Sequence, residues 1–451
     1  MIRLLVIISL GACLLLTSGF SGCAKRKGLP PPEIKEDFEP VSQTLKVDVF
    51  FDATLSMRGF VSTQSSSFYQ QTVPLLERSV IEGWKGGEVS FYKFGDDIAP
   101  LPGRAYLEAV KPAFYGDSKY NRKTLIERVI DKAQPDHLTV IVTDLFQSNA
   151  DVNQLSEKLK QKFIANNLAI GSYAIRSQFE GSVYDVGPSA YSFGYKSDKP
   201  ERNRPFYLLA FGTHADIAHY FDVLAATGVN TFPDKHELIL SRHLSSRLAS
   251  FSGAKLKTAD RVSEISSSNL VSGDYRGNHV KAFKISKGRT KAKLIIDLRY
   301  DAALPNVMGY GSDLTSEVTA WKGEDKGGKV LVPVENAEAQ KAFHVVANLL
   351  PQQTPFDKLQ LRVDIEVSDL PGAGIYQYRI VLRPKPNTLA DWIPLWNMRD
   401  DEIQTWHRNP HDFNGAKTYN LENFLGTLQG AVLSTTPPKV GDLHLYIQVD
   451  K

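Results

Sequence analysis

The hydrophobic and polar positions of residues 45–232 predict an α/β domain. Short apolar runs, typical of strands buried in a parallel sheet, alternate there with segments whose apolar residues recur every three or four positions, as on one face of a helix. The predicted strands are 47–51, 88–94, 138–143, 168–175 and 206–211, and the predicted helices are 69–80, 124–130, 152–165 and 214–226. Because strands separated by helices need crossover connections, we expect an open, doubly wound, Rossmann-like sheet. Residues 177–203, rich in Gly, Ser, Tyr and Pro, predict an insertion at one edge of this sheet.

From residue 235 onward the apolar residues alternate with polar ones instead. Leu294, Ile296 and Leu298 alternate with charged neighbours, and residues 361–367 repeat the pattern. Period-two alternation with one polar face is typical of antiparallel sheet half exposed to water, so we expect a β-sandwich-like domain. Within it, the strand at 280–285 is expected to pair with the strand around Ile296 through a turn at 287–290.

The first 22 residues predict an export signal, in which Arg3 precedes an apolar run too short for the roughly 20 residues of a membrane span. The end of this segment, Phe20-Ser21-Gly22-Cys23, resembles the lipobox of bacterial lipoproteins, with phenylalanine where that motif prefers leucine. The resemblance implies cleavage before Cys23 and a lipid, including palmitate, on that cysteine. An earlier match ending at Cys13 leaves an apolar region shorter than the roughly 7–15 residues expected. The alternative is an ordinary signal peptide that ends near a cysteine.

Composition supports an exported, folded chain. Cys13 and Cys23 are the two cysteines of the sequence, so cleavage leaves one thiol at the first mature position, where acylation removes it, and no internal disulfide can form. The mature chain is about three times a typical domain in length, and its 42% hydrophobic and 23% charged residues are those of a globular protein. The net charge of +3 and the lack of a basic stripe with interleaved aromatics predict no nucleic-acid partner.

The residues after Cys23 predict a flexible tether that ends near residue 44, because a proline run at 30–32 favours extended polyproline geometry. The basic residues 25–27 either touch anionic headgroups, at about 1 kcal/mol each, or are a solvated start of the linker. In lipoproteins of bacteria with an outer membrane, aspartate after the lipidated cysteine retains the protein at the inner membrane. Ala24 therefore implies an outer-membrane location facing the periplasm.

The expected organisation thus has five parts. They are a signal peptide (1–22), the lipidated cysteine with its tether (23–44), the α/β domain (45–232), the β-sandwich-like domain (235–386) and a C-terminal α+β extension (387–451) with a helix near 421–432 and a last strand at 443–449.

Oxygen-bearing side chains follow two of the predicted strands. Asp52, Thr54 and Ser56 come directly after the first strand, Asp144 follows the strand at 138–143, and Thr124 opens a predicted helix. Ligands of open α/β sheets bind where the carboxyl ends of the strands converge. Carboxylate and hydroxyl oxygens suit a hard cation such as Mg²⁺, and an ion held by few carboxylates keeps positive character and attracts another anion.

This pattern resembles the metal-ion-dependent adhesion site of the von Willebrand factor type A (VWA) domain. That family uses Asp-x-Ser-x-Ser after its first strand, a threonine at the start of a later helix and an aspartate after its fourth strand. The corresponding residues here are Asp52, Thr54, Ser56, Thr124 and Asp144. The resemblance covers roughly residues 45–230 and implies a Mg²⁺ ion, or Ca²⁺ or Mn²⁺, whose open position accepts a carboxylate from a partner protein.

The sequence departs from the family's pattern at three positions. Thr54 replaces a serine but keeps the hydroxyl, Leu145 stands where the family has glycine after the aspartate, and Thr124 follows a basic dipeptide rather than glycine. The alternative interpretation is that these residues only cap helices and satisfy loop backbone in a fold without a metal site.

Three functions from different classes follow. The favoured hypothesis is a lipid-anchored envelope protein that is no enzyme and grips an envelope protein through the ion. A second is a metal-dependent hydrolase or phosphoryl enzyme, for which the sequence offers no clear general base beyond Asp144. A third is a purely structural envelope lipoprotein with no bound metal. No Ser-His-Asp arrangement or Gly-rich phosphate loop appears with the neighbours it needs.

Overall fold

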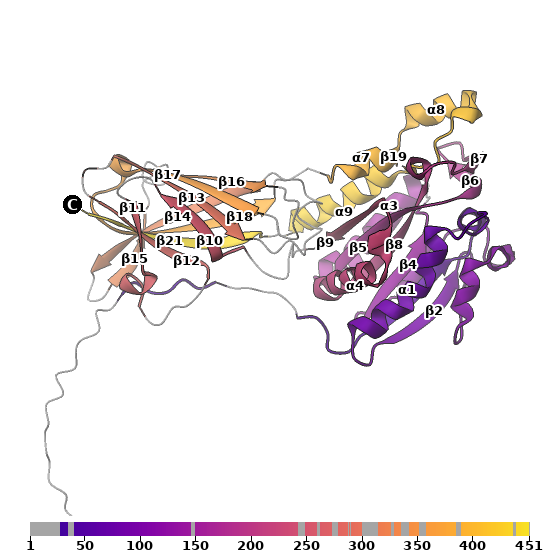
Figure 1. Cartoon of the computed structure of the whole chain (residues 1–451), viewed down its shortest axis with the longest axis horizontal. Coiled ribbons are helices and arrows are strands. Elements are labelled where there is room, and N and C mark those ends of the chain that lie inside the picture. The colour runs from indigo at the N-terminus through magenta and orange to yellow at the C-terminus, as the bar shows by residue number, and fades with distance from the viewer. Residues whose placement is uncertain are drawn as a thin grey trace, which may run out of the picture.

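The structure is a computed structural model with two bodies, an α/β domain and a β-rich domain (Figure 1). It describes residues 28–34, 40–145, 149–241, 249–258, 262–272, 278–286, 288, 290–299, 314–325, 329–334, 342–350, 358–384, 389–435 and 439–450. The expected export signal and Cys23 lie outside the described residues. None of the helices in the described ranges is long and apolar enough to cross a bilayer.

A seven-stranded mixed sheet forms the centre of the α/β domain. In order across the sheet, its strands are β3 (Ile98–Pro100), β2 (Glu88–Phe94), β1 (Lys46–Asp52), β4 (His137–Thr143), β8 (Arg204–Gly212), β5 (Ala169–Ser177) and β9 (Lys235–Leu240). β1 lies parallel to both β2 and β4, which confirms the expected parallel arrangement at the centre of the sheet.

The expected doubly wound pattern, in which crossover helices separate the strands, fails at β8, which runs antiparallel to both β4 and β5. No crossover helix separates β5 from β8. The predicted insertion there forms a hairpin of β6 (Glu180–Val186) and β7 (Tyr191–Lys196), followed by a short turn η5 (Pro200–Arg202). The chain therefore re-enters the sheet from the edge at which it left, which requires the opposite direction.

Helices cover both faces of this sheet. One face carries α1 (Phe68–Gly83) and α4 (His214–Thr227), and the other carries α2 (Ile126–Lys132), α3 (Asn149–Lys162) and α9 (Leu421–Thr435). Ser67 caps the start of α1, since its hydroxyl accepts from the Gln70 N–H and the Gln70 amide oxygen accepts from the Ser67 N–H. Short turns complete the domain: η1 (Leu55–Val61), η2 (Ala105–Val110), η3 (Pro112–Gly116), η4 (Ile164–Asn166) and η6 (Val229–Thr231).

Two sheets form the β-rich domain. The first contains, in order, β10 (Ser250–Thr258), β13 (Lys291–Arg299), β17 (Lys358–Glu366) and β16 (Phe343–Leu350). The second contains β11 (Val262–Ile265), β12 (Val280–Ile285), β21 (Gly441–Val449), β18 (Gly374–Pro384), β14 (Leu314–Asp325) and β15 (Lys329–Pro333). The turn η7 (Ser267–Asn269) lies between β11 and β12, and η8 (Val367–Asp369) lies between β17 of the first sheet and β18 of the second. Apolar residues of both sheets share one core. In it, the Phe343 ring of the first sheet stacks on the Tyr378 ring of the second, with 3.8 Å between the ring centroids.

The expected hairpin between residues 280–285 and the strand around Ile296 is wrong. β12 and β13 belong to different sheets, and β12 pairs with β11 and with the distant β21 instead. Period-two alternation indicates which face of a strand is buried but does not specify its partner, so two successive alternating strands can equally cross from one sheet to the other.

The chain also crosses the expected domain boundaries. β9 begins at Lys235 and is the edge strand of the α/β sheet, although the sequence pattern assigned that residue to the β-rich domain. Residues 387–451 do not form an extension of their own, because α9 packs on α3 while β21 lies inside the second β sheet. The remaining elements of this region are α7 (Trp392–Trp396), β19 (Asn397–Met398), α8 (Asp400–Arg408), η9 (Pro410–Asp412) and β20 (Thr418–Tyr419).

The described part of the expected flexible tether is held at two points. Leu29 is fully buried in the β-rich domain and forms a parallel bridge with Val271. Ser42 is bound to the α/β domain, where its N–H and its hydroxyl both donate to the Asp216 carboxylate at 2.8 Å. The segment is therefore a connector attached at Leu29 and at Ser42. The local sequence does not indicate that the Leu29 side chain is buried in the β-rich domain.

Candidate functional site

The carboxyl edge of β1 and β4 brings together the five residues predicted from the sequence. Asp52 ends β1 and is fully buried, and its Oδ1 accepts from the N–H of Thr54 at 3.0 Å and from the Thr54 hydroxyl at 2.7 Å. Its Oδ2 accepts from the hydroxyl of Thr124 at 3.2 Å and from that of Thr143 at 2.8 Å. Both carboxylate oxygens thus have donors, which fixes the orientation of the group.

Three hydroxyl oxygens form a row above this carboxylate. The Thr54 Oγ1 lies 3.0 Å from the Ser56 Oγ and 3.3 Å from the Thr124 Oγ1. The Ser56 hydroxyl donates to Asp144 Oδ1 at 3.2 Å, so the row joins the two carboxylates. The same three residues line a cleft of about 630 Å³, whereas Asp52 and Asp144 lie buried beneath it. Hydroxyl groups therefore face the solvent-accessible side of the site, with the carboxylates behind them.

Thr124 reaches the site from a loop rather than from a helix start. The sequence predicts a helix from Thr124 onward, but α2 begins at Ile126 and has Leu125 at its cap position. Asp96 holds this loop, since its carboxylate accepts from the N–H of Arg122 at 3.0 Å and from that of Lys123 at 3.3 Å. The basic residues that precede Thr124 thus contribute backbone groups that position its hydroxyl.

Two side chains in this network, Thr143 and Arg204, were missed by the sequence analysis. Arg204, the first residue of β8, donates from Nη2 to Asp144 Oδ2 at 2.9 Å, and both side chains are 1% exposed. A sequence signal for Arg204 exists, because an arginine at the start of a strand otherwise made of apolar residues requires a buried acceptor. The sequence does not indicate which of the many carboxylates supplies it.

Leu145, where the resemblance leads us to expect glycine, has a backbone conformation that favours glycine. Its φ is +53°, in the left-handed region that leucine adopts only at a cost. Its side chain is buried in the core with Ile126 and Leu155, and its N–H donates to the Thr143 hydroxyl at 3.2 Å. The turn after Asp144 therefore holds a leucine in a strained conformation, and burial of its side chain in the core offsets the strain.

A segment of the C-terminal region binds the same arginine. We call residues 413–418 the C-terminal strap. Three arginines of the α/β domain donate to its carbonyl oxygens: Arg202 to Phe413 at 3.3 Å, Arg204 to Gly415 at 3.3 Å and Arg176 to Ala416 at 3.1 Å. Arg204 therefore links the strap directly to Asp144 of the candidate site.

Burial raises the pKa of Asp52 from 3.8 to about 6, and the negative charge of Asp144 adds to this effect. Hydrogen bonds from Thr54 and Thr143 oppose it. An acid whose pKa is higher in the folded protein binds more protons there than in the unfolded chain at pH values between the two pKa values.

The metal-free protein is therefore expected to lose stability as the pH rises from about 4 to about 6, by an amount on the order of 2 kcal/mol from this group. The Asp52→Asn variant lacks this contribution. Urea unfolding in metal-free buffer at pH 4.5 and pH 7.5 checks the prediction: the free energy of unfolding of the wild type, relative to Asp52→Asn, should be higher at the lower pH. An equal difference at both pH values would contradict it.

The donor set fits a hard cation. In the described part of the chain, no cluster of three or more His, Cys, Asp or Glu side chains is arranged to hold a metal ion. An ion at this site would therefore depend on the Thr54, Ser56 and Thr124 hydroxyls together with the two carboxylates. An all-oxygen set with two carboxylates and open space for water is the environment that Mg²⁺ accepts, and it offers nothing to a metal that prefers sulfur or imidazole.

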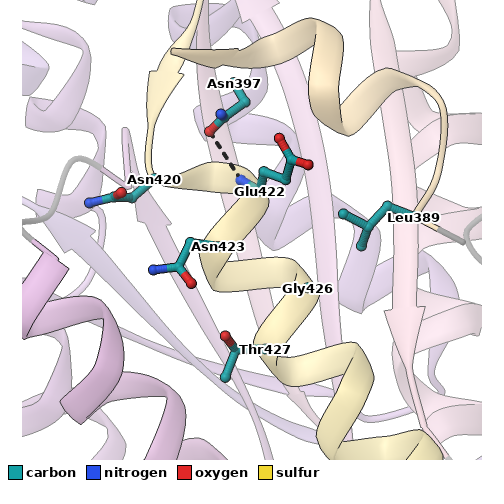
Figure 2. Close-up of a pocket in the computed structure, with 7 residues that line it drawn as sticks. All are labelled: Leu389, Asn397, Asn420, Glu422, Asn423, Gly426 and Thr427. Atoms are coloured by element: carbon teal, nitrogen blue, oxygen red, sulfur yellow. Dashed lines mark hydrogen bonds between the residues drawn. The ribbon is translucent and has the colours of Figure 1, made fainter. Parts of the chain in front are cut away.

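A second hollow, of about 520 Å³, lies at the start of α9 (Figure 2). Its lining is polar, with the carboxamides of Asn397, Asn420 and Asn423 beside Glu422. The Asn397 side-chain oxygen accepts from the Glu422 N–H at 3.1 Å, the bond drawn in Figure 2, so this residue caps the helix. Its lining has one carboxylate, that of Glu422, and no counterpart of the Asp52–Asp144 pair that lies beneath the first cleft.

Comparison with known proteins gives no independent assignment. No family model matches the chain, and no curated protein matches it either.

Proposed function

We propose that this chain is a lipid-anchored binding protein of the cell envelope, outer-membrane and facing the periplasm, whose VWA-like α/β domain grips a partner protein through a divalent cation, Mg²⁺ in the first place. The observation that carries the proposal is the convergence of Asp52, Thr54, Ser56, Thr124 and Asp144 at one edge of the sheet. The Thr54, Ser56 and Thr124 hydroxyls and the carboxylates of Asp52 and Asp144 would together hold the ion, directly or through bound water.

The charge balance of the site supports an anionic partner group. Asp52 and Asp144 carry two negative charges and the buried Arg204 one positive charge, so a divalent ion leaves the site with a net positive charge. The walls of the cleft add no net charge, because the positive charges of Arg122 and Lys123 balance the negative charges of Glu127 and Asp185. Attraction for a carboxylate of the partner would come from the ion itself, which supplies a strong local positive charge when bound.

The binding role is tested by affinity capture from envelope extract on the immobilised mature protein, with Mg²⁺ or with a chelator. A partner is expected to be retained with Mg²⁺, to elute with the chelator and to be lost on Asp52→Asn. The matched control is Asp136→Asn, which removes the same charge at an exposed position beside the amino end of β4, the opposite edge of the sheet. Retention that is unchanged by the chelator and by Asp52→Asn would refute metal-dependent binding.

The anchor is tested separately by labelling growing cells with palmitate. Label is expected on the wild type and not on Cys23→Ser. An unlabelled wild type would refute the anchor while leaving the metal site open to its own test.

A further inference from the structure

We propose that residues 28–30 hold the β-rich domain against the lipid bilayer, so that the candidate metal site of the α/β domain faces away from the membrane. The proposal rests on the lipid anchor at Cys23, which is part of the proposed function.

Leu29 is attached to the β-rich domain by its side chain and its backbone. Its side chain is 0% exposed and packs with Leu270, Val271, Val280 and Tyr446 of the β-rich domain. Its N–H donates to the Leu270 carbonyl at 2.8 Å, and its carbonyl accepts from the N–H of Ser272 at 2.7 Å. The Tyr446 hydroxyl donates to the Pro30 carbonyl at 3.2 Å. Both the side chain and the backbone of this short segment are thus bound.

Two glycines make the attachment close-fitting. A Cβ on Gly28 would lie 2.5 Å from the Ser272 nitrogen, a backbone atom that cannot move aside. A Cβ on Gly323, in β14, would lie 3.0 Å from the Leu29 Cδ2. The Gly28 backbone therefore approaches that of Ser272 too closely for any side chain, and the Leu29 side chain packs tightly against Gly323.

The chain between the proposed anchor at Cys23 and the attachment at Leu29 is short. Five residues lie between Cys23 and Leu29, and a fully extended chain over that interval reaches about 20 Å. A domain of about 150 residues has a radius of gyration of about 15 Å, so the reach is shorter than the domain is wide. A lipid on Cys23 therefore keeps the Leu29 attachment within about 20 Å of the headgroups, and the basic residues 25–27 lie in this interval.

The cleft of the candidate metal site lies at the end of the α/β domain that is remote from the β-rich domain (Figure 1). Its wall includes Tyr184 and Asp185 of the β6–β7 hairpin. Figure 1 shows this hairpin at the end of the α/β domain that is remote from the β-rich domain. The hydrogen bonds of Ser42 to Asp216 also fix the connector to the α/β domain. The chain is therefore attached to the β-rich domain at Leu29 and to the α/β domain at Ser42.

The test uses the full mature lipoprotein, purified from membranes and reconstituted in vesicles of phosphatidylethanolamine and phosphatidylglycerol that contain an energy-transfer acceptor on the headgroup. A donor fluorophore is placed on Asn269→Cys, an exposed position of η7 beside the Leu29 attachment, or on Ser189→Cys, an exposed position at the tip of the β6–β7 hairpin. Transfer from position 269 is expected to be several-fold stronger than from position 189. In Leu29→Asp the difference should largely disappear, whereas Leu395→Asp, at a leucine 69% exposed, should leave it intact.

The outcomes separate the two levels of the proposal. Mass spectrometry of the purified protein shows whether Cys23 is acylated. Equal transfer from the two positions of an acylated protein would overturn the orientation and leave the anchor standing. An unacylated protein would overturn the orientation together with the anchor. Circular dichroism of Leu29→Asp establishes that a lost difference reflects a released segment rather than an unfolded domain.

Discussion

The Arg204→Met substitution is expected to lower the free energy of unfolding by about 3–5 kcal/mol, because it leaves the buried Asp144 carboxylate without its charge partner. Methionine fills a similar length with an uncharged chain, so the loss comes mainly from the unpaired charge. The same change removes the hydrogen bond from Arg204 to the Gly415 carbonyl and so loosens the C-terminal strap. Denaturant unfolding in metal-free buffer measures the effect.

Two comparisons separate this cause from a general loss of packing. The Arg204→Met/Asp144→Asn double variant removes both charges and is expected to be more stable than Arg204→Met alone. Arg202→Met is the matched control, since Arg202 also donates to the strap, at 3.3 Å, but its side chain is 35% exposed and its pairing with Asp198 is worth at most about 1 kcal/mol. If Arg204→Met costs no more than Arg202→Met, the buried pair does not hold Asp144 as described.

Magnesium is expected to raise the melting temperature of the wild-type protein. At about 100 times its dissociation constant, a ligand that binds only the folded state adds about 2.7 kcal/mol of stability. For a domain of roughly 200 residues this corresponds to a rise of about 5–10 °C. Differential scanning calorimetry with Mg²⁺, and then with Ca²⁺ and Mn²⁺, measures the shift and ranks the ions.

The response should depend on the residues of the candidate site. Asp52→Asn and Thr54→Val are expected to abolish the rise, because one removes a carboxylate charge and the other a hydroxyl ligand, whereas Asp136→Asn should keep it. A wild type that shows no shift at millimolar Mg²⁺ would support the structural alternative, in which these groups serve only each other. A shift that persists in Asp52→Asn would place the ion elsewhere.

Arg204 connects the candidate site of the α/β domain to the C-terminal region of the chain. Its guanidinium contacts both Asp144 and the C-terminal strap, and the strap belongs to the region that supplies α9 to one domain and β21 to the other.

The central strands, the main helices and the position of the candidate site were predictable because they depend on short-range patterns. An apolar run flanked by helical periodicity indicates β1 and β4 whatever surrounds them, and parallel strands deliver their carboxyl ends to one edge. Asp52 and Asp144 therefore come within reach of shared hydroxyls as a consequence of local pattern and topology together.

The amino-acid sequence by itself determined the α/β alternation around β1, the later change to period-two strands and the acidic and hydroxyl residues at one sheet edge. Only the tertiary structure decided the direction of β8, the partner of β12, the pairing of Arg204 with Asp144 and the burial of Leu29. The physical reason is common to all four. Periodicity records which side of an element is buried, but a partner distant in sequence is chosen by shape, charge and chain connection acting at once, and no local pattern records that choice.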